Sequence, residues 1–358
     1  MKFSKLFLVA LGSISVLVSC TDDEATTGVA GAYDNGVFIL NEGGSAKGTA
    51  SFISNDLVSF TQDVYGSVNT PDYFGGYAQS MFFNGDNAYI ISGAANEITV
   101  VNRYTFELIT KIDTGLSRPR YGVVKDGKAY VVNAKTYSYE NAATGNTDDF
   151  VAVINLTTSL VESTINLNAT GNRIVSEGAK LYITEPYNNT KVLVINPTTN
   201  TLEAPITIGA GGDVMEVNDG FIYILKSPTD PITYASLQGG LIKVKLSDNT
   251  TSEIIFPTTL IGAKNLDIYN NKIYYTNGNS VYSMDLTATT ASTTAICTYT
   301  SAFSSNDVHG FAVNNGHIFV ADGGDYSANS NAYVYSLTGT LEKTLTVGVG
   351  PNGFYFNN

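Results

Sequence analysis

A short motif recurs seven times along the 358-residue chain, and this repetition limits the possible folds more than any other feature. Each copy begins with a turn rich in Asn, Asp and Gly, continues as an apolar strand centred on an aromatic residue, and ends in a polar residue. The aromatic residues are Phe38, Tyr89, Tyr130, Tyr182, Tyr223, Tyr274 and Phe319, separated by 51, 41, 52, 41, 51 and 45 residues. Repeats of this length with several short strands each are typical of β-propellers. The sequence therefore predicts an all-β fold, a seven-bladed β-propeller.

The two ends of the chain predict how the ring closes. Every internal repeat has an inner strand just before its turn, but only polar residues precede the first turn at Asp34. Residues Gly353–Phe356 have the pattern of an inner strand that no further repeat follows. We expect this strand to join blade one, which closes the ring and removes exposed sheet edges. Residues 34–358 would then form a single propeller domain.

The composition fits a β protein and argues against one class of partner. The chain has 23 Tyr, 17 Phe and no Trp, and it is 43% apolar and 14% charged. Its net charge of −13, without a Lys or Arg cluster, argues against nucleic acid binding. The only cysteines are Cys20 and Cys297, so we expect no disulfide in the mature fold. Cys297 is predicted to be a small buried residue on an outer strand.

The N-terminus has the pattern of a bacterial export signal. Lys2 and Lys5 precede an apolar run, residues 6–18, that is too short to span a bilayer stably. The sequence Leu-Val-Ser-Cys that ends at Cys20 resembles a lipobox, which predicts a signal peptide over residues 1–19 and lipidation of Cys20. The alternative is an ordinary signal peptide with an incidental cysteine. Residues 20–33 would be a flexible acidic tether, whose Thr-Asp-Asp-Glu start resembles the surface-export signal of Bacteroidota lipoproteins.

Several segments carry a family resemblance. Residues 98–105 and 118–124, the run 192–202 and the closing segment 348–354 resemble the YVTN-type repeat of YncE-like propellers. Together with the lipobox, they make the chain similar to the YncE-like surface lipoproteins of Bacteroidota. Some of these, the BtuG group, capture cobalamin and pass it to an outer-membrane TonB-dependent transporter. The resemblance implies a lipid-anchored outer-membrane protein that faces the cell exterior and binds a corrinoid or another large polar nutrient for such a transporter.

Aligning the repeats by their turns predicts two rings of side chains at one mouth of the channel. The first ring comes from the start of each inner strand and comprises Gln79, Arg120, Gly171, Asp213, Lys264, His309 and Asn352. The second ring lies three residues after each aromatic residue and comprises Asn41, Ser92, Asn133, Glu185, Lys226, Asn277 and Asp322. A propeller channel is wet, so its mouth is polar whatever the function. The mixture of charges, however, favours an asymmetric polar ligand.

Long loops at the same face carry exposed aromatic residues. The loops 134–149, 227–240 and 323–331 contain Tyr137, Tyr139, Tyr234 and Tyr326, and the segment 65–77 adds Tyr73 and Tyr77. Rigid aromatic rings above a polar floor suit flat or sugar-like ligands. The alternative is that these tyrosines pack down on neighbouring blades.

The leading hypothesis is non-catalytic ligand capture without a resident cofactor or metal. Cationic residues would bind carbonyl or phosphate groups of the ligand, and acidic and amide residues would accept from its amides or hydroxyls. The proposed donors are Arg120, Lys264, His309 and Lys226, and the proposed acceptors are Asp213, Glu185, Asn133 and Asp322.

Two other hypotheses stay open. The first is a metal-assisted lactonase or lyase, with His309 at its centre and a divalent cation held by Asp213, Glu185 and Asp322. The sequence shows no nucleophile motif and no carboxylate matched to His309, so catalysis is not expected. The second is a scaffold whose loop-rich face docks a partner protein.

Overall fold

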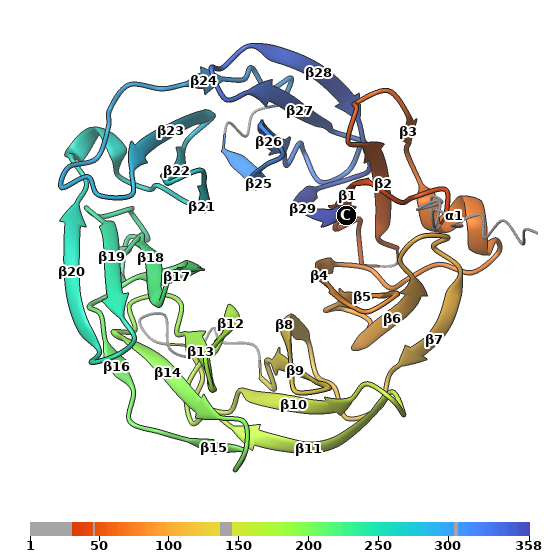
Figure 1. The fold of residues 1–358 in the computed structure, drawn as a ribbon, viewed down its shortest axis with the longest axis horizontal. Helices are drawn as coiled ribbons and strands as arrows, with labels where there is room; N and C mark the ends of the chain where they lie inside the picture. Colours follow the sequence, from red (N-terminus) through yellow and green to blue (C-terminus); the bar gives the residue numbers. More distant parts are fainter. Residues whose placement is uncertain (1–30, 46, 137–144, 304–306) are drawn as a thin grey trace, which may run out of the picture.

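The computed structural model describes residues 31–45, 47–136, 145–303 and 307–358. Within these residues, the strands form seven antiparallel sheets arranged as blades around a central channel (Figure 1). The predicted seven-bladed propeller is therefore confirmed. Cys20, Tyr137 and Tyr139 lie outside the described residues.

Each blade contributes one inner strand to the channel wall. From blade one to blade seven these are β29 (Pro351–Asn357), β4 (Ala78–Asn84), β8 (Pro119–Lys125), β12 (Ile174–Glu177), β17 (Gly212–Asn218), β21 (Leu266–Tyr269) and β25 (Val308–Asn314). The second strands are β1 (Gly36–Asn41), β5 (Asn87–Ser92), β9 (Lys128–Asn133), β13 (Lys180–Thr184), β18 (Phe221–Lys226), β22 (Lys272–Asn277) and β26 (His317–Asp322).

The outer half of each blade contains the remaining strands. The third strands are β2 (Thr49–Ser54), β6 (Glu97–Asn102), β10 (Phe150–Asn155), β14 (Lys191–Asn196), β19 (Gly240–Lys245), β23 (Ser280–Asp285) and β27 (Asn331–Ser336). The outermost strands are β3 (Phe60–Thr61), β7 (Leu108–Ile112), β11 (Leu160–Asn166), β15 (Thr201–Leu202) with β16 (Ile206–Thr207), β20 (Thr250–Ile255), β24 (Cys297–Thr298) and β28 (Leu341–Thr346). A 3₁₀ turn, η1 (Thr258–Leu260), follows β20.

The core consists of apolar clusters between neighbouring blades. All seven aromatic repeat residues lie on second strands and are at most 5% exposed. Phe319 of blade seven, for example, packs on Phe354 of blade one with ring centroids 5.4 Å apart. Because both faces of a blade are covered, the second and third strands read as continuous apolar runs rather than alternating patterns. Cys297 is buried on the outer strand β24, as predicted.

Ring closure occurs as the sequence predicts. The C-terminal strand β29 pairs with β1, with Phe38 opposite Tyr355 and Ile39 opposite Phe354. The Asn357 side chain adds a link by donating to the carbonyl oxygens of Tyr33 and Arg103, at 2.6 and 2.9 Å. Blade one is thus built from both ends of the described chain.

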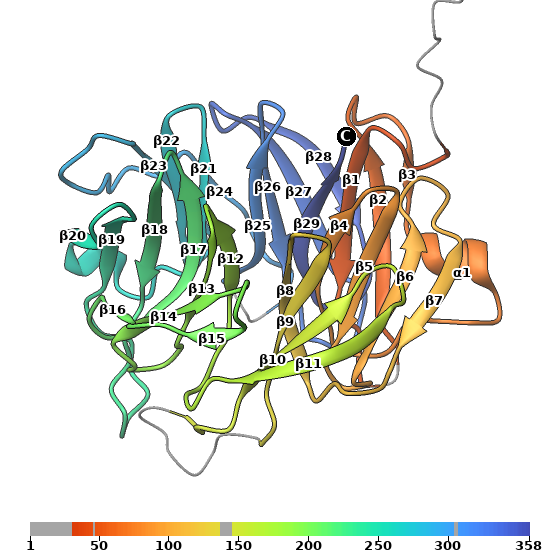
Figure 2. The same ribbon diagram turned by 60° about the horizontal axis from the view of Figure 1, so that its bottom comes forward.

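The propeller has two different faces, and we name them by their connections. The turn face carries the tight hairpins between inner and second strands, such as the Asp126–Gly127 turn, in which both residues have positive φ. The loop face carries the connections between blades and the long loops after the second strands; it lies at the bottom of Figure 2. Tyr33 is on the turn face, since its N–H donates to the Tyr104 carbonyl in a hairpin there.

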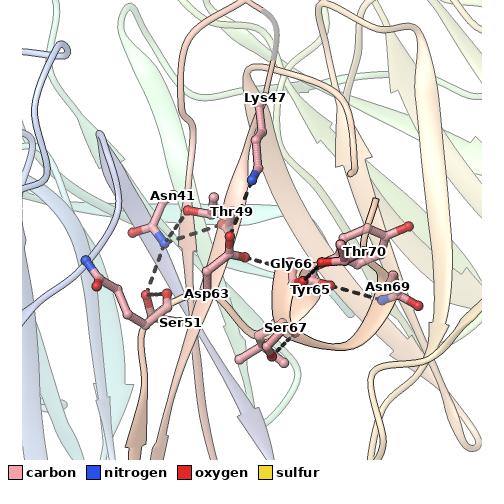
Figure 3. Close-up of polar contacts among 12 residues, drawn as sticks. Asn41, Lys47, Thr49, Ser51, Asp63, Tyr65, Gly66, Ser67, Asn69 and Thr70 are labelled. Carbon is pink, nitrogen blue, oxygen red and sulfur yellow. Dashed lines mark hydrogen bonds and ion pairs between the residues drawn. The ribbon is translucent and has the colours of Figure 1, made fainter. Parts of the chain in front are cut away.

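One short helix, α1 (Val64–Asn69), was not expected from the sequence. Asp63 caps it by accepting from the Gly66 N–H at 3.0 Å and forms an ion pair with Lys47 at 3.4 Å (Figure 3). Tyr65 is 1% exposed and packs edge-on against Phe74. The helix therefore covers the outer side of blades one and two, and two aromatic residues of the segment 65–77 belong to the core.

Candidate functional site

The loop-face mouth of the channel contains two adjoining cavities. The first has a volume of about 460 Å³, and residues from five consecutive inner strands or the segments just before them contribute polar side chains to its wall: Gln79, Arg120, Asn172, Asp213 and Lys264. The second, of about 500 Å³, shares Gln79, Arg120 and Tyr187 with the first and adds Glu42 and Tyr77. The structure thus brings four members of the first predicted ring into one cavity wall.

Strand register corrects one member of that ring. Met215 pairs with Ile224 as Ile174 pairs with Ile183, so Asp213 on β17 corresponds to Asn172 before β12. Asn172, and not Gly171, therefore takes the fourth place in the ring. The Asn172 side chain donates to Asp213 Oδ1 at 2.7 Å, which links blades four and five. Gly171 lies eleven residues before the aromatic residue of its repeat, whereas Gln79, Arg120, Asp213, Lys264 and His309 each lie ten residues before theirs.

A buried carboxylate, that of Asp149, holds the Arg120 side chain in place. Its guanidinium lies 3.4 Å from Asp149 Oδ2 and also donates to the Gly171 carbonyl. Asp149 is 1% exposed and accepts from the Gly171 N–H at 3.0 Å, while burial raises its pKa to about 6. Arg120 keeps 22% of its side chain exposed. The cation is thus held in place, and its exposed part lines both cavities.

Lys264 and Lys226 have different surroundings. Lys264 pairs with Asp307, and both side chains are about half exposed, so water screens this pair and Lys264 can exchange partners. Lys226 is 11% exposed and binds Glu253 on the outer strand β20 at 2.6 Å. Lys264 lines the first cavity, whereas Lys226 lines neither.

His309 has a carboxylate partner that sequence reasoning missed. Its Nε2 lies 2.9 Å from Glu42 Oε1, and the Asn352 side chain donates to the same oxygen at 3.3 Å. On the other side of the ring, Nδ1 lies 3.4 Å from the Tyr326 hydroxyl, with the two rings edge-on. Glu42 directly follows the second-ring position Asn41, which is the signal that could have identified it. His309 is therefore not an isolated histidine.

Most of the second ring supports the loops instead of facing the opening. Asn133 is fully buried and accepts from the Ser117 N–H at 2.9 Å, and Asp322 is fully buried and accepts from the Gly324 N–H at 3.0 Å. Glu185 is 7% exposed, and burial raises its pKa. None of these three lines either cavity. Asn133 and Asp322 are corrected from ligand contacts to residues that hold neighbouring backbone, and Glu185 and Lys226 lie outside both cavities.

The predicted tyrosines separate into two groups. Tyr77 lines the second cavity, Tyr326 contacts His309, and Tyr234 is 67% exposed at the tip of the loop after β18. Tyr73 is also half exposed but lines neither cavity. Tyr187, which the sequence reasoning missed because its loop is short, is 47% exposed and lines both cavities.

Two absences among the described residues bear on the alternative functions. Among them, no group of three or more His, Cys, Asp or Glu residues is arranged to hold a metal ion. In the same part of the chain, no helix is both long and apolar enough to cross a membrane.

The fold and its closed ring define this protein as a seven-bladed β-propeller. A family model described as "Domain of unknown function (DUF5074)" matches residues 35–308, and the chain belongs to that family. No curated protein matches the sequence significantly.

Solved structures resemble the chain in fold. A quinonprotein alcohol dehydrogenase-like protein from Bacteroides thetaiotaomicron aligns with a TM-score of 0.63 and 16% identity, over 91% of this chain and 79% of that one. A candidate 6-phosphogluconolactonase from Bacteroides uniformis aligns with a TM-score of 0.62 and 14% identity, over 90% of this chain and 99% of that one. Hydrazine synthase from Kuenenia stuttgartiensis aligns with a TM-score of 0.59 and 12% identity, over 75% and 86%. At these identities the likeness concerns the fold alone.

Proposed function

We propose that this propeller captures a large polar ligand at its loop-face mouth and does not transform it. The observation that carries the proposal is the pair of adjoining cavities that share Gln79, Arg120 and Tyr187. Their walls combine a fixed cation, a mobile cation at Lys264, the Asp213 carboxylate and amide groups. Such a wall can satisfy several different polar groups on one asymmetric ligand.

The exposed tyrosines support a ligand with a flat face. Tyr77 and Tyr187 line the cavities and are each about half exposed. A tyrosine ring offers a large contact area with only two side-chain torsions to fix, so contact with a planar ligand costs little entropy. A corrinoid, with a planar macrocycle edged by amide groups, matches this combination, and it is the ligand class that we propose.

The position of Tyr33, near the first described residue, supports a cell-surface receptor. Tyr33 lies on the turn face, opposite the cavities. If Cys20 is lipidated, as proposed from the lipobox, an anchor on this side leaves the loop face free of the membrane. The proposed role is thus that of an outer-membrane lipoprotein that delivers its ligand to a TonB-dependent transporter.

Titration calorimetry with cyanocobalamin tests the proposal, with two matched pairs of variants. Tyr187→Ala and Lys264→Ala remove cavity residues, whereas Tyr73→Ala and Lys272→Ala remove an equally exposed tyrosine and a lysine of the turn face. We expect saturable binding that each cavity variant weakens about tenfold, a loss of about 1.4 kcal/mol. The two control variants should bind like the wild type. Absence of binding would contradict the proposed corrinoid ligand. Equal losses of affinity in the cavity and control variants would contradict the proposed location of the site.

The contact between His309 and Glu42 supports one alternative function, that of an enzyme. A histidine oriented by a carboxylate is the arrangement of a general base, so a metal-assisted lactonase or lyase centred on His309 is the second candidate. Metal analysis after chelation and reloading separates the two. A stoichiometric divalent ion lost from His309→Ala but retained by His317→Ala supports the enzyme, and no retained ion supports capture.

A further inference from the structure

A third cavity lies further along the channel, on the turn-face side of the two loop-face cavities. It has a volume of about 500 Å³ and is lined by the inner strands β17, β21, β25 and β29 and by Arg173 just before β12. Val214 lines both this cavity and the first loop-face cavity, so the two follow one another along the channel.

Two acidic side chains occupy neighbouring positions in its wall. Glu216 on β17 pairs with Tyr223, and Asp267 on β21 pairs with Tyr274, which makes them equivalent residues of adjacent blades. Asp267 is fixed, because its two oxygens accept from the Ile268 and Val313 N–H groups at 2.7 and 2.6 Å. Burial and the Asp267 charge raise the pKa of Glu216 to about 8. The pair therefore retains a proton at neutral pH unless a cation takes its place.

Arg173 lines the same cavity but forms no ion pair with Glu216. The Arg173 guanidinium stacks on the Tyr121 ring at 3.8 Å from its centroid, and its buried Nε has no hydrogen-bond partner. Asp267 and Arg173 are the charged groups that shift the pKa of Glu216, so Arg173 and Glu216 attract one another without direct contact. The buried Oδ1 atom of Asn352, in the same cavity, also lacks a partner. Arg173 lines the cavity, so its guanidinium is placed to take a ligand carboxylate.

We propose that this channel cavity binds a small zwitterion of the α-amino acid class. The ligand ammonium group contacts Glu216 and Asp267, and its carboxylate accepts from Arg173. Phe311 and Leu266, which line the same cavity, face its side chain. One ligand of this chemistry contacts the acid pair and the Arg173 guanidinium together, which an amine or a carboxylic acid alone does not.

Calorimetry with the full propeller tests this site, using glycine, L-leucine and L-glutamine as probes. Isopentylamine and 4-methylpentanoate are leucine without its carboxylate and without its ammonium group. We expect at least one amino acid to bind saturably, and the leucine fragments to bind at least about tenfold more weakly than leucine. Titrations in buffers of different ionisation enthalpy should show proton release, because the ammonium group displaces the proton of the acid pair.

Two variants and a control locate the binding. Glu216→Gln keeps the shape of the protonated acid and should fold normally, and Arg173→Met keeps the stacked length without the charge. We expect each to weaken amino acid binding about tenfold or more, and Glu177→Gln, at the end of β12 and outside the cavity, to leave it unchanged. The proposal fails if none of the three amino acids binds, if isopentylamine binds as tightly as leucine, or if Glu216→Gln binds like the wild type.

Discussion

Four tyrosines of the loop face have a backbone conformation that side chains usually avoid. Tyr77, Tyr187, Tyr234 and Tyr326 have φ angles of 49°, 64°, 58° and 58°. A left-handed conformation costs a bulky residue about 1 kcal/mol or more, which Gly or Asn would avoid. Leu57 and Phe106 share this conformation but are buried, so packing accounts for them. The four tyrosines are about half exposed or more, so burial does not account for their conformation.

The strain at Tyr187 predicts an unusual order of stabilities. Glycine adopts positive φ freely and alanine does not. We therefore expect the free energy of unfolding of Tyr187→Gly to be about 1 kcal/mol larger than that of Tyr187→Ala. Urea denaturation of the two variants measures this difference. At Tyr73, whose φ is not positive, the order should reverse, since glycine adds only chain entropy to the unfolded state. The same order at both positions would show that Tyr187 is not strained.

At the scale of strands, the repeat pattern was enough to predict the fold, because each aromatic residue marks a second strand that two neighbouring blades must cover. The pairing of β29 with β1 followed from a missing strand at one end and an extra strand at the other. The helix α1 escaped prediction because six residues are too few to show a helical period, and its stability comes from the Asp63 cap and from packing of Tyr65.

The site was harder to predict than the strands that build it. The start of each inner strand could be aligned, so Gln79, Arg120, Asp213 and Lys264 were placed together. A position in a repeat does not tell whether a side chain faces the channel or its own loop, which is why Asn133 and Asp322 were misjudged. Glu42 follows a repeat position directly and could have been found from it, whereas Tyr187 lies in a short loop, and only its place in the cavity walls identifies it.

At the scale of the whole molecule, the channel wall couples stability to pH. The ordinary pKa of Glu216 is 4.5, and in the folded protein it rises to about 8. The folded state therefore holds a proton that the unfolded state has lost, so this stabilisation is full below pH 4.5 and disappears as the pH rises through 8. Glu216→Gln cannot titrate. In thermal unfolding, we expect the stability of Glu216→Gln relative to the wild type to increase from pH 5 to pH 9. A stability difference that stays constant over this range would contradict the raised pKa.

Mapping the face of the ring that binds the ligand decides whether capture occurs at the loop-face mouth. Hydrogen–deuterium exchange with and without cyanocobalamin compares the loop-face segments 42–45, 186–190, 227–239 and 323–330 with the turn-face hairpins 84–87, 126–128 and 270–272. We predict slower exchange in the loop-face segments and unchanged exchange in the hairpins. Protection confined to the hairpins, or no change in either set, would contradict capture at the loop-face mouth.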